Sequence, residues 1–141
     1  MLTGILNSLR GYRRQFDALE NAIFAEVRGA LPEMSKSAFD DRLRRVNVIQ
    51  PILGRTEVNF FERRKGQIFF PTSSRILSTD ESIRIATVKS EATDNLSRFT
   101  VGVYCANGVL TSLEFDKPTE HSAIENITSI TASFSPDTPW A

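Results

Sequence analysis

The hydrophobic pattern of this sequence changes its period near residue 55, and this change limits the possible folds more than any other feature. Before it, apolar residues recur at spacings of three and four, as on one stripe of a helix; after it, they alternate with polar residues, as on a half-buried strand. Runs of helix followed by runs of strand favour an α+β fold. We expect two N-terminal helices followed by an antiparallel meander sheet of about five strands, with the long helix packed on one face.

The first predicted helix covers residues 2–31. Pro32 ends it, because the residue before a proline is disfavoured in the α region. The apolar stripe allows two arrangements: packing on the sheet of the same chain, or a coiled-coil homodimer through residues 2–27. The stripe consists of Leu2, Ile5, Leu9, Tyr12, Phe16, Leu19 and Ile23.

A second, shorter helix is predicted from Ser37 to Ile49. Ser37 resembles an N-cap with Asp40 as its partner, and Pro51 and Gly54 end the element. Its apolar face carries Phe39, Leu43 and Val46, and its solvated face carries Arg42, Arg44 and Arg45.

Strands are predicted at 55–63, 67–71, 82–90, 98–105, 109–115 and 126–134. Residues 64–66 read as a turn, and Asn107-Gly108 predicts a two-residue type I′ hairpin turn because both central positions need positive φ. That turn places Cys105 opposite Leu110 and Tyr104 opposite Thr111. The expected core is Leu9, Phe16, Leu19, Ile23, Phe39, Leu43, Val58, Phe60, Ile85, Val101, Val103 and Leu113.

The composition is that of one globular domain spanning residues 1–141, with a helical part at 1–50, a sheet at 55–135 and a tail at 136–141. The single cysteine excludes an internal disulfide and favours a reducing compartment. The N-terminus lacks the continuous apolar run of a signal peptide, and no segment approaches the roughly 20 apolar residues of a membrane span. We therefore expect a cytoplasmic protein without a membrane partner.

No motif typical of an enzyme, cofactor or metal site occurs in the sequence. Cys105 and His121 are the only cysteine and histidine, which is too few for the usual zinc site. Glu114 and Asp116 share one face of a predicted strand, but a glycosidase cleft needs more Trp and Tyr than the three present. We expect no catalytic residues, no cofactor and no metal.

Charge is divided unequally along the chain. Residues 1–75 hold 13 Lys/Arg and 8 Asp/Glu, so their net charge is +5, and residues 76–141 hold 4 and 9, so theirs is −5. The two halves either attract each other on folding, or the second half presents an acidic surface to a basic partner.

Two basic clusters support an alternative function, as a nucleic-acid-associated or oligomeric accessory domain. The first is Arg42, Arg44 and Arg45 on the second helix; the other is Arg63, Arg64 and Lys65 at a hairpin tip, near Phe60 and Phe61. The zero net charge disfavours binding to phosphates, so nucleic acid is the less favoured partner.

Residues 99–120, FTVGVYCANGVLTSLEFDKPTE, resemble the hairpin near the end of many small bacterial immunity-like proteins of polymorphic toxin systems. In those families a strand leads to a glycine turn, and a second strand of the form apolar-x-x-Leu-Glu runs into an acidic tail that contains a proline. The matching positions here are Asn107, Gly108, Leu110, Leu113, Glu114, Asp116 and Pro118. The likeness covers 22 of the 141 residues.

This resemblance implies a non-catalytic protein that binds a toxin and occludes its active site. Many such toxins are nucleases with basic clefts, and an acidic surface would complement them in charge. The implied partner-binding residues are Glu114, Asp116 and Glu120, followed by Asp80 and Glu81.

Overall fold

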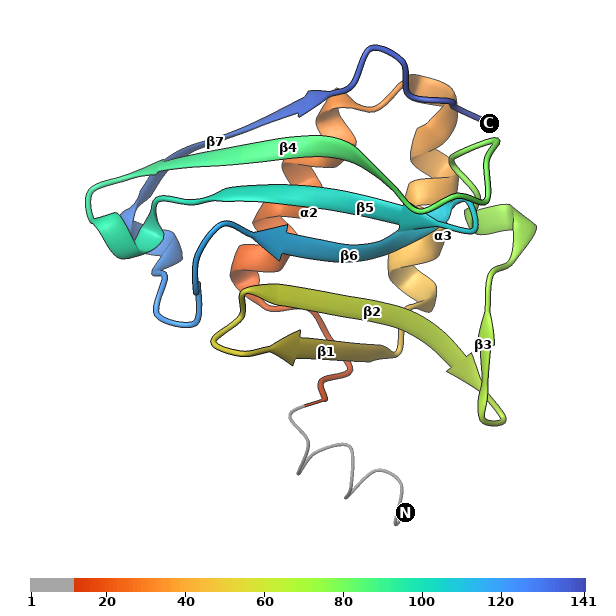
Figure 1. Cartoon of the computed structure of the whole chain (residues 1–141), viewed down its shortest axis with the longest axis horizontal. Coiled ribbons are helices and arrows are strands. Elements are labelled where there is room, and N and C mark those ends of the chain that lie inside the picture. Colours follow the sequence, from red (N-terminus) through yellow and green to blue (C-terminus); the bar gives the residue numbers. More distant parts are fainter. Residues whose placement is uncertain (1–11) are drawn as a thin grey trace.

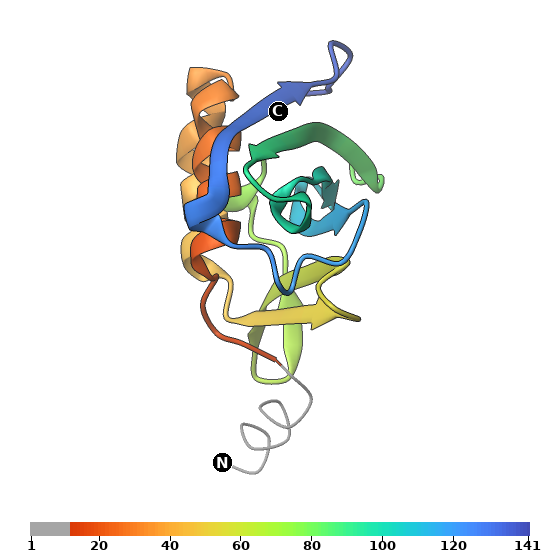
Figure 2. The same cartoon turned by 90° about the vertical axis from the view of Figure 1, so that its left-hand side faces the viewer.

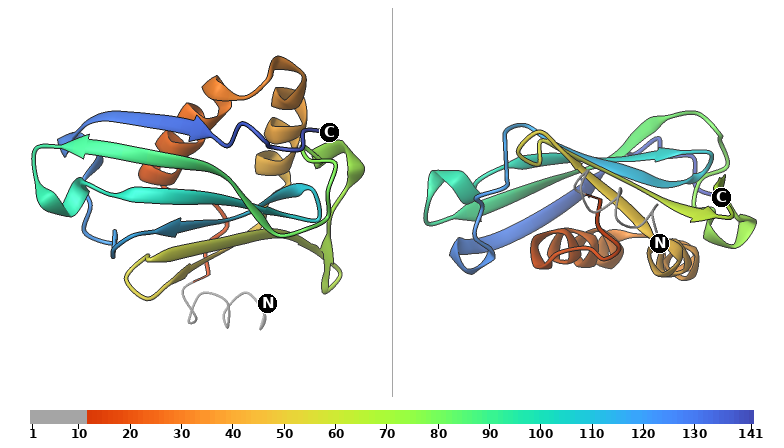
Figure 3. Two further views of the ribbon diagram at one scale, coloured as in Figure 1. Left: turned by 45° about the horizontal axis from the view of Figure 1, so that its top comes forward. Right: turned by 90° about the horizontal axis from the view of Figure 1, so that it is seen from below.

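The computed structural model describes residues 12–141 and shows two layers, a pair of helices and one antiparallel sheet (Figure 1). The helices, α2 (Ala18–Ala30) and α3 (Lys36–Arg45), lie on the same face of the sheet (Figure 3). The strands are β1 (Val48–Ile52), β2 (Glu57–Arg64), β3 (Gln67–Phe69), β4 (Ile83–Ala92), β5 (Thr100–Ala106), β6 (Val109–Phe115) and β7 (Ile127–Phe134). The expected α+β class with an antiparallel sheet is confirmed. No helix within the described range is long and apolar enough to cross a membrane.

The strand order differs from the expected meander. The strands follow the order β1-β2-β6-β5-β4-β7, and β3 pairs with β2 off that path. The strands β1, β2 and β3 pair in chain order, as do β4, β5 and β6, but β2 adjoins β6 and β7 returns to the far edge of β4. The sheet curls toward the helices, and β7 contacts α2 at that edge (Figure 2).

The predicted helix over residues 2–31 is not continuous, since within the described residues α2 begins only at Ala18. Asp17 is the N-cap of α2, and it forms a capping box in which its carboxylate accepts from the Glu20 amide and the Glu20 carboxylate accepts from the Asp17 amide. Before this cap, Arg13 pairs as extended backbone with Ile49 of β1, through two hydrogen bonds of 2.7 Å. Leu19 and Ile23 are buried against the sheet, and the earlier stripe residues Leu2, Ile5 and Leu9 lie outside the described range.

The second helix is shifted and shortened relative to the prediction. It begins at Lys36 after a 3-10 turn, its N-cap is Ser35, and Ser37 and Asp40 lie inside it, where Asp40 accepts from Arg28 of α2. It ends at Arg45, because the chain turns there into β1, a strand that the sequence analysis missed. Pro51 is tolerated in β1 because this strand lies at the edge of the sheet.

Both predicted hairpin turns are present. Lys65-Gly66 and Asn107-Gly108 have positive φ at both positions, 50° and 77° in the first and 54° and 79° in the second, as type I′ turns require. Cys105 pairs with Leu110 as expected. Tyr104 pairs with Ser112 instead of Thr111, because a β-bulge separates Tyr104 from Cys105.

The core lies between the helices and the sheet. Nine of the twelve expected core residues are buried, Phe16 and Leu43 are partly buried, and Leu9 lies outside the described range. Phe16 packs its ring edge-to-face on Phe24 and Phe60, with centroids 4.8 and 5.2 Å apart. The buried nine are Leu19, Ile23, Phe39, Val58, Phe60, Ile85, Val101, Val103 and Leu113.

A buried arginine joins α3 to the sheet. Arg42 is fully buried; its Nε donates to the carbonyl of Leu110 on β6 (2.8 Å), and its Nη2 donates to the carbonyl of Phe60 on β2 (3.4 Å). β2 and β6 pair directly only at 57–59, so this guanidinium continues their connection where the ladder stops. Burial lowers the pKa of Arg42 to about 10, so the side chain keeps its charge at neutral pH.

Arg42→Ala is expected to lower the free energy of unfolding by about 3–5 kcal/mol, because two buried carbonyls lose their donor and Glu62 loses a nearby positive charge. Urea denaturation measures the loss. Arg44→Ala on the exposed side of the same helix is the control, with an expected cost below about 1 kcal/mol. Equal costs for the two variants would contradict the bridging role of Arg42.

Gly108→Ala is expected to destabilise the protein more than Gly66→Ala. Both glycines have positive φ, which costs an L-residue about 1–2 kcal/mol. A Cβ on Gly108 would also lie 2.7 Å from Cγ of Arg75, whereas a Cβ on Gly66 meets nothing within 4 Å. Thermal or urea denaturation of both variants compares the two costs, and an equal loss would show that Arg75 moves away freely.

Candidate functional site

The sheet face opposite the helices is open and polar. The strand register aligns Glu57 of β2, Glu114 of β6, Gly102 of β5, Thr87 of β4 and Ser133 of β7 in one row across this outer face. Directly opposite residues of antiparallel strands point to the same side, so the row begins with two carboxylates and ends with two hydroxyls. The two carboxylates are the only charged groups of this row.

Glu57 and Glu114 are a like-charged cross-strand pair. Asn59 donates a hydrogen bond of 2.9 Å to Oε2 of Glu57, but neither carboxylate forms an ion pair within residues 12–141. Like charges directly opposite each other on a sheet destabilise it. This pair therefore concentrates negative charge at one end of the row, and the cationic side chain of Arg84 lies over Gly102, the next residue of the row.

Asp116 and Glu120 extend the negative surface beyond the end of β6. Asp116 is exposed and held in place, since its Oδ1 accepts from the Thr100 amide at 3.0 Å and its amide donates to the Thr100 carbonyl at 2.9 Å. Glu120 is exposed in the loop after β6, where its amide donates to the carbonyl of Gly54 at 3.0 Å. The structure thus brings three predicted site residues, Glu114, Asp116 and Glu120, to one end of the sheet, beside Glu57.

The turn between β1 and β2 lies at this acidic end. Arg55 in the turn is engaged elsewhere: it donates to Thr119 (Oγ1 at 3.2 Å, carbonyl at 2.7 Å) and pairs with Asp17 at the start of α2. The guanidinium of Arg55 is therefore already bound by Thr119 and Asp17. Leu53 at the tip of the turn is 84% exposed and has a positive φ of 33°, an unfavourable backbone for a leucine. An exposed apolar side chain thus adjoins the acidic surface.

The other two predicted residues lie at the opposite end of the sheet. The Asp80 carbonyl accepts from the amide of Asn107, which places Asp80 and Glu81 beside the β5–β6 turn. The length of β6 separates this turn from Glu114, roughly 20 Å at about 3.4 Å per residue. Asp80 is also paired with Arg75 at 2.7 Å. The five predicted residues therefore do not form one rim.

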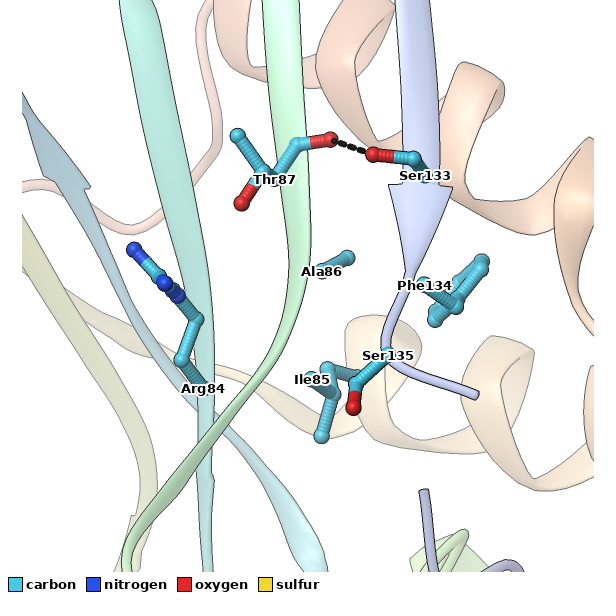
Figure 4. Close-up of a pocket in the computed structure, with 7 residues that line it drawn as sticks. All are labelled: Arg84, Ile85, Ala86, Thr87, Ser133, Phe134 and Ser135. Carbon is cyan, nitrogen blue, oxygen red and sulfur yellow. Dashed lines mark hydrogen bonds between the residues drawn. The ribbon is translucent and has the colours of Figure 1, made fainter. Parts of the chain in front are cut away.

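A shallow hollow of about 300 Å³ lies between β4 and β7 (Figure 4). Its polar groups include Thr87, Ser133 and Ser135, and Ser133 Oγ already donates to the Thr87 carbonyl at 3.4 Å. Arg84 points away from these hydroxyls, toward β5. The one charged residue and the hydroxyl groups of the lining therefore lie apart.

The residues that could have supplied nucleophilic or metal chemistry are separated. Cys105 is buried in the core, where desolvation raises the pKa of its thiol to about 12. His121 is exposed in the loop between β6 and β7, beside Glu120 at 3.4 Å. No three His, Cys, Asp or Glu side chains between residues 12 and 141 gather as a metal site would require.

The two basic clusters are largely engaged in internal contacts. Arg42 is in the core, Arg44 and Arg45 both pair with Asp41, and Arg64 pairs with the buried Glu62. On the second helix, Arg42 is therefore withdrawn from the surface, while Arg44 and Arg45 remain at the surface as ion pairs with Asp41.

Asp41 is a buried acid in the middle of α3 that accepts several hydrogen bonds. Its Oδ2 accepts from Ser74 (2.6 Å), Ser73 (2.8 Å) and Nε of Arg45 (2.9 Å). The Ser74 hydrogen bond contributes most, and these contacts together lower the pKa of Asp41 to about 2. Asp41 thereby ties α3 to the 3-10 turn at Thr72–Ser74.

Sequence reasoning missed Glu57 and an exposed apolar segment. Glu57 faces Glu114 only because β2 pairs with β6, two strands that are distant in sequence. The apolar segment is Ile68, Phe69 and Phe70, which are 52%, 43% and 43% exposed. The run QIFFP before a polar loop was the available signal for it.

Comparisons of the chain with models of protein families, with curated proteins and with solved structures found no match.

Stability is expected to fall in acid in a way that depends on Asp41. Because its folded pKa is below the unfolded value of about 3.9, its carboxylate stabilises the fold above about pH 4, and this contribution is lost as the pH falls toward 2. The free-energy difference between the wild type and Asp41→Asn should therefore shrink from on the order of 1–2 kcal/mol at pH 6 toward zero near pH 2. Urea denaturation across this range measures it, and a constant difference would contradict the assignment.

Proposed function

We propose that this chain is a non-catalytic protein-binding module that receives a basic partner at the acidic end of its outer face, as an immunity-type inhibitor of a toxin would. The carrying observation is the cross-strand pair Glu57–Glu114, whose two charges face each other and form no ion pair within residues 12–141. A cationic side chain of the partner between them would turn a repulsive contact into two attractive ones.

The magnitude of this effect suits a binding surface. A like-charged cross-strand pair costs roughly 0.2–1 kcal/mol of stability, and that cost is relieved when a cation binds. Asp116 and Glu120 extend the same negative potential, which accelerates encounter with a positive partner and disfavours negative ones. Leu53 adds an exposed apolar contact next to these charges.

The toxin hypothesis proposes a class of protein that would bind this surface. The hairpin that resembles immunity-like proteins corresponds to β5 and β6, and β6 and the residue that follows it carry Glu114 and Asp116. A nuclease-type toxin with a basic cleft would be complementary in charge to this end. Asp80 and Glu81 are not part of the proposed surface, since they lie at the other end of the sheet.

Charge reversal at each end of the sheet tests the proposal. Glu114→Lys with Asp116→Lys is expected to abolish capture of a basic protein partner, and Asp80→Lys with Glu81→Lys should leave capture intact. The captured protein is then purified, and its affinity is measured by calorimetry at two salt concentrations, because charge-driven binding weakens with salt.

Folding is the internal control for this experiment. Glu114→Lys faces Glu57 with an opposite charge, which offsets the hydrogen bond from the Thr100 amide that Asp116→Lys removes, so the free energy of unfolding of the acidic-end variant in urea should lie within about 1 kcal/mol of that of the wild type. A stable acidic-end variant that still binds every partner would contradict the proposed surface.

A further inference from the structure

The strand β3 exposes an apolar edge. Ile68, Phe69 and Phe70 follow one another with exposures of 52%, 43% and 43%, and β3 pairs with β2 alone. In Figure 1, β2 bends away from the rest of the sheet into this hairpin. An exposed edge strand carries unpaired backbone groups that can template pairing with another chain, and exposed apolar side chains beside it add contact area.

The backbone of β3 has groups available for pairing. The two-residue turn Lys65-Gly66 makes Arg64 and Gln67 a hydrogen-bonded pair, and Glu62 with Phe69 is the next pair of that kind. By the alternation of antiparallel ladders, the N–H and C=O of Ile68 then point away from β2. No hydrogen bond of these two groups occurs within the described chain.

The charges around this edge are positive. Arg63 lies directly opposite Ile68 on β2, and Lys65 is in the turn. Neither forms an ion pair within residues 12–141, whereas Arg64 is bound to Glu62. The edge thus combines an apolar strip, free backbone groups and two uncompensated cations.

We infer that β3 is a docking edge for an extended protein segment that alternates apolar and acidic residues and adds to the sheet as a further strand. Its backbone would pair with Ile68. Its acidic side chains would lie on the face that Ile68 shares with Arg63, and its apolar side chains would cover Phe69 on the other face. Pro71 follows directly, so the added pairing is short.

The charges favour this occupant over two others. A second copy would bring its own residues 63–71, which contain no acidic side chain, and would leave both cations unmatched. A nucleic acid would find two free cations on a chain of zero net charge, which is little for phosphate binding. This surface is opposite in sign to the acidic end and does not depend on the function proposed for it.

The test uses a fluorescein-labelled, blocked heptapeptide of alternating glutamate and valine, titrated with the intact chain and followed by anisotropy. Binding below about 1 mM is expected, with the amide signals of Ile68 and its neighbours shifting in nitrogen-15 correlation spectra. A peptide with lysine in place of glutamate, and one with alternate amides methylated, should bind at least tenfold more weakly.

Two variants separate backbone pairing from apolar contact. Ile68→Pro removes only the N–H that points away from β2, so the β2–β3 hairpin is retained while binding should fall at least tenfold. Ile68→Thr keeps that N–H and should bind more tightly than Ile68→Pro. Unchanged correlation spectra outside residues 62–71 are the folding control.

Several outcomes would overturn the inference. These are no binding at 1 mM peptide, equal binding by Ile68→Pro, or equal binding of the lysine peptide. Self-association of the chain that Ile68→Pro abolishes would identify a second copy as the occupant instead. Binding of oligothymidylate that Arg63→Glu with Lys65→Glu abolishes would identify a single-stranded nucleic acid.

Discussion

The hydrogen bonds of Arg42 determine how β2 is shared between its neighbours. β6 pairs with β2 at 57–59, the Arg42 guanidinium takes the carbonyl of Phe60, and β3 pairs with β2 at 62–64. Without a donor at Phe60, a buried carbonyl would remain unpaired between the two ladders, at a cost of about 1–3 kcal/mol. One helical side chain therefore lets a single strand belong first to the main sheet and then to a separate hairpin.

Both surfaces proposed for binding depend on this division of β2. The pair Glu57–Glu114 exists because β2 is paired with β6 before the Arg42 contact, and the edge of β3 is open because β2 leaves the sheet after it. Glu62 stabilises the same region: it is buried on β2, bound to Arg64, and close enough to Arg42 to raise the pKa of that guanidinium against the effect of burial. The buried charges are thus structural, and the uncompensated charges are on the surface.

Local patterns predicted the parts of the fold that local interactions determine. The Asn107-Gly108 turn, the Lys65-Gly66 turn and the apolar face of α2 were all visible, because turn chemistry and helical periodicity act within a few residues. The start of α2 was missed because the stripe continues through Asp17, although Asp17 with Glu20 is itself a capping signal. The strand order was missed because pairing of β2 with β6 depends on contacts between distant segments.

The same limit held for the candidate site: features within one segment could be predicted, and contacts between distant segments could not. Glu114 and Asp116 were named because their hairpin resembles that of immunity-like proteins and the second half of the chain is acidic, but placing Glu57 beside them required the register of the sheet. Arg42 was assigned to the solvated face of its helix. It lies three residues after Phe39 and four before Val46, which places it on the apolar stripe, and this spacing could have indicated a buried arginine.

The order of charges along β2 also constrains any partner that covers the whole strand. Glu57 and Arg63 are six residues apart on the same side of the strand, roughly 20 Å at about 3.4 Å per residue. This separation exceeds the Debye length of about 8 Å at physiological salt, so the two ends act as independent charges on an approaching molecule. A partner that is basic at one end and acidic at the other is favoured in one orientation and disfavoured in the reverse one. A uniformly basic partner is repelled from the hairpin. The acidic end and the β3 edge therefore accept either two separate partners or one dipolar partner in a fixed orientation.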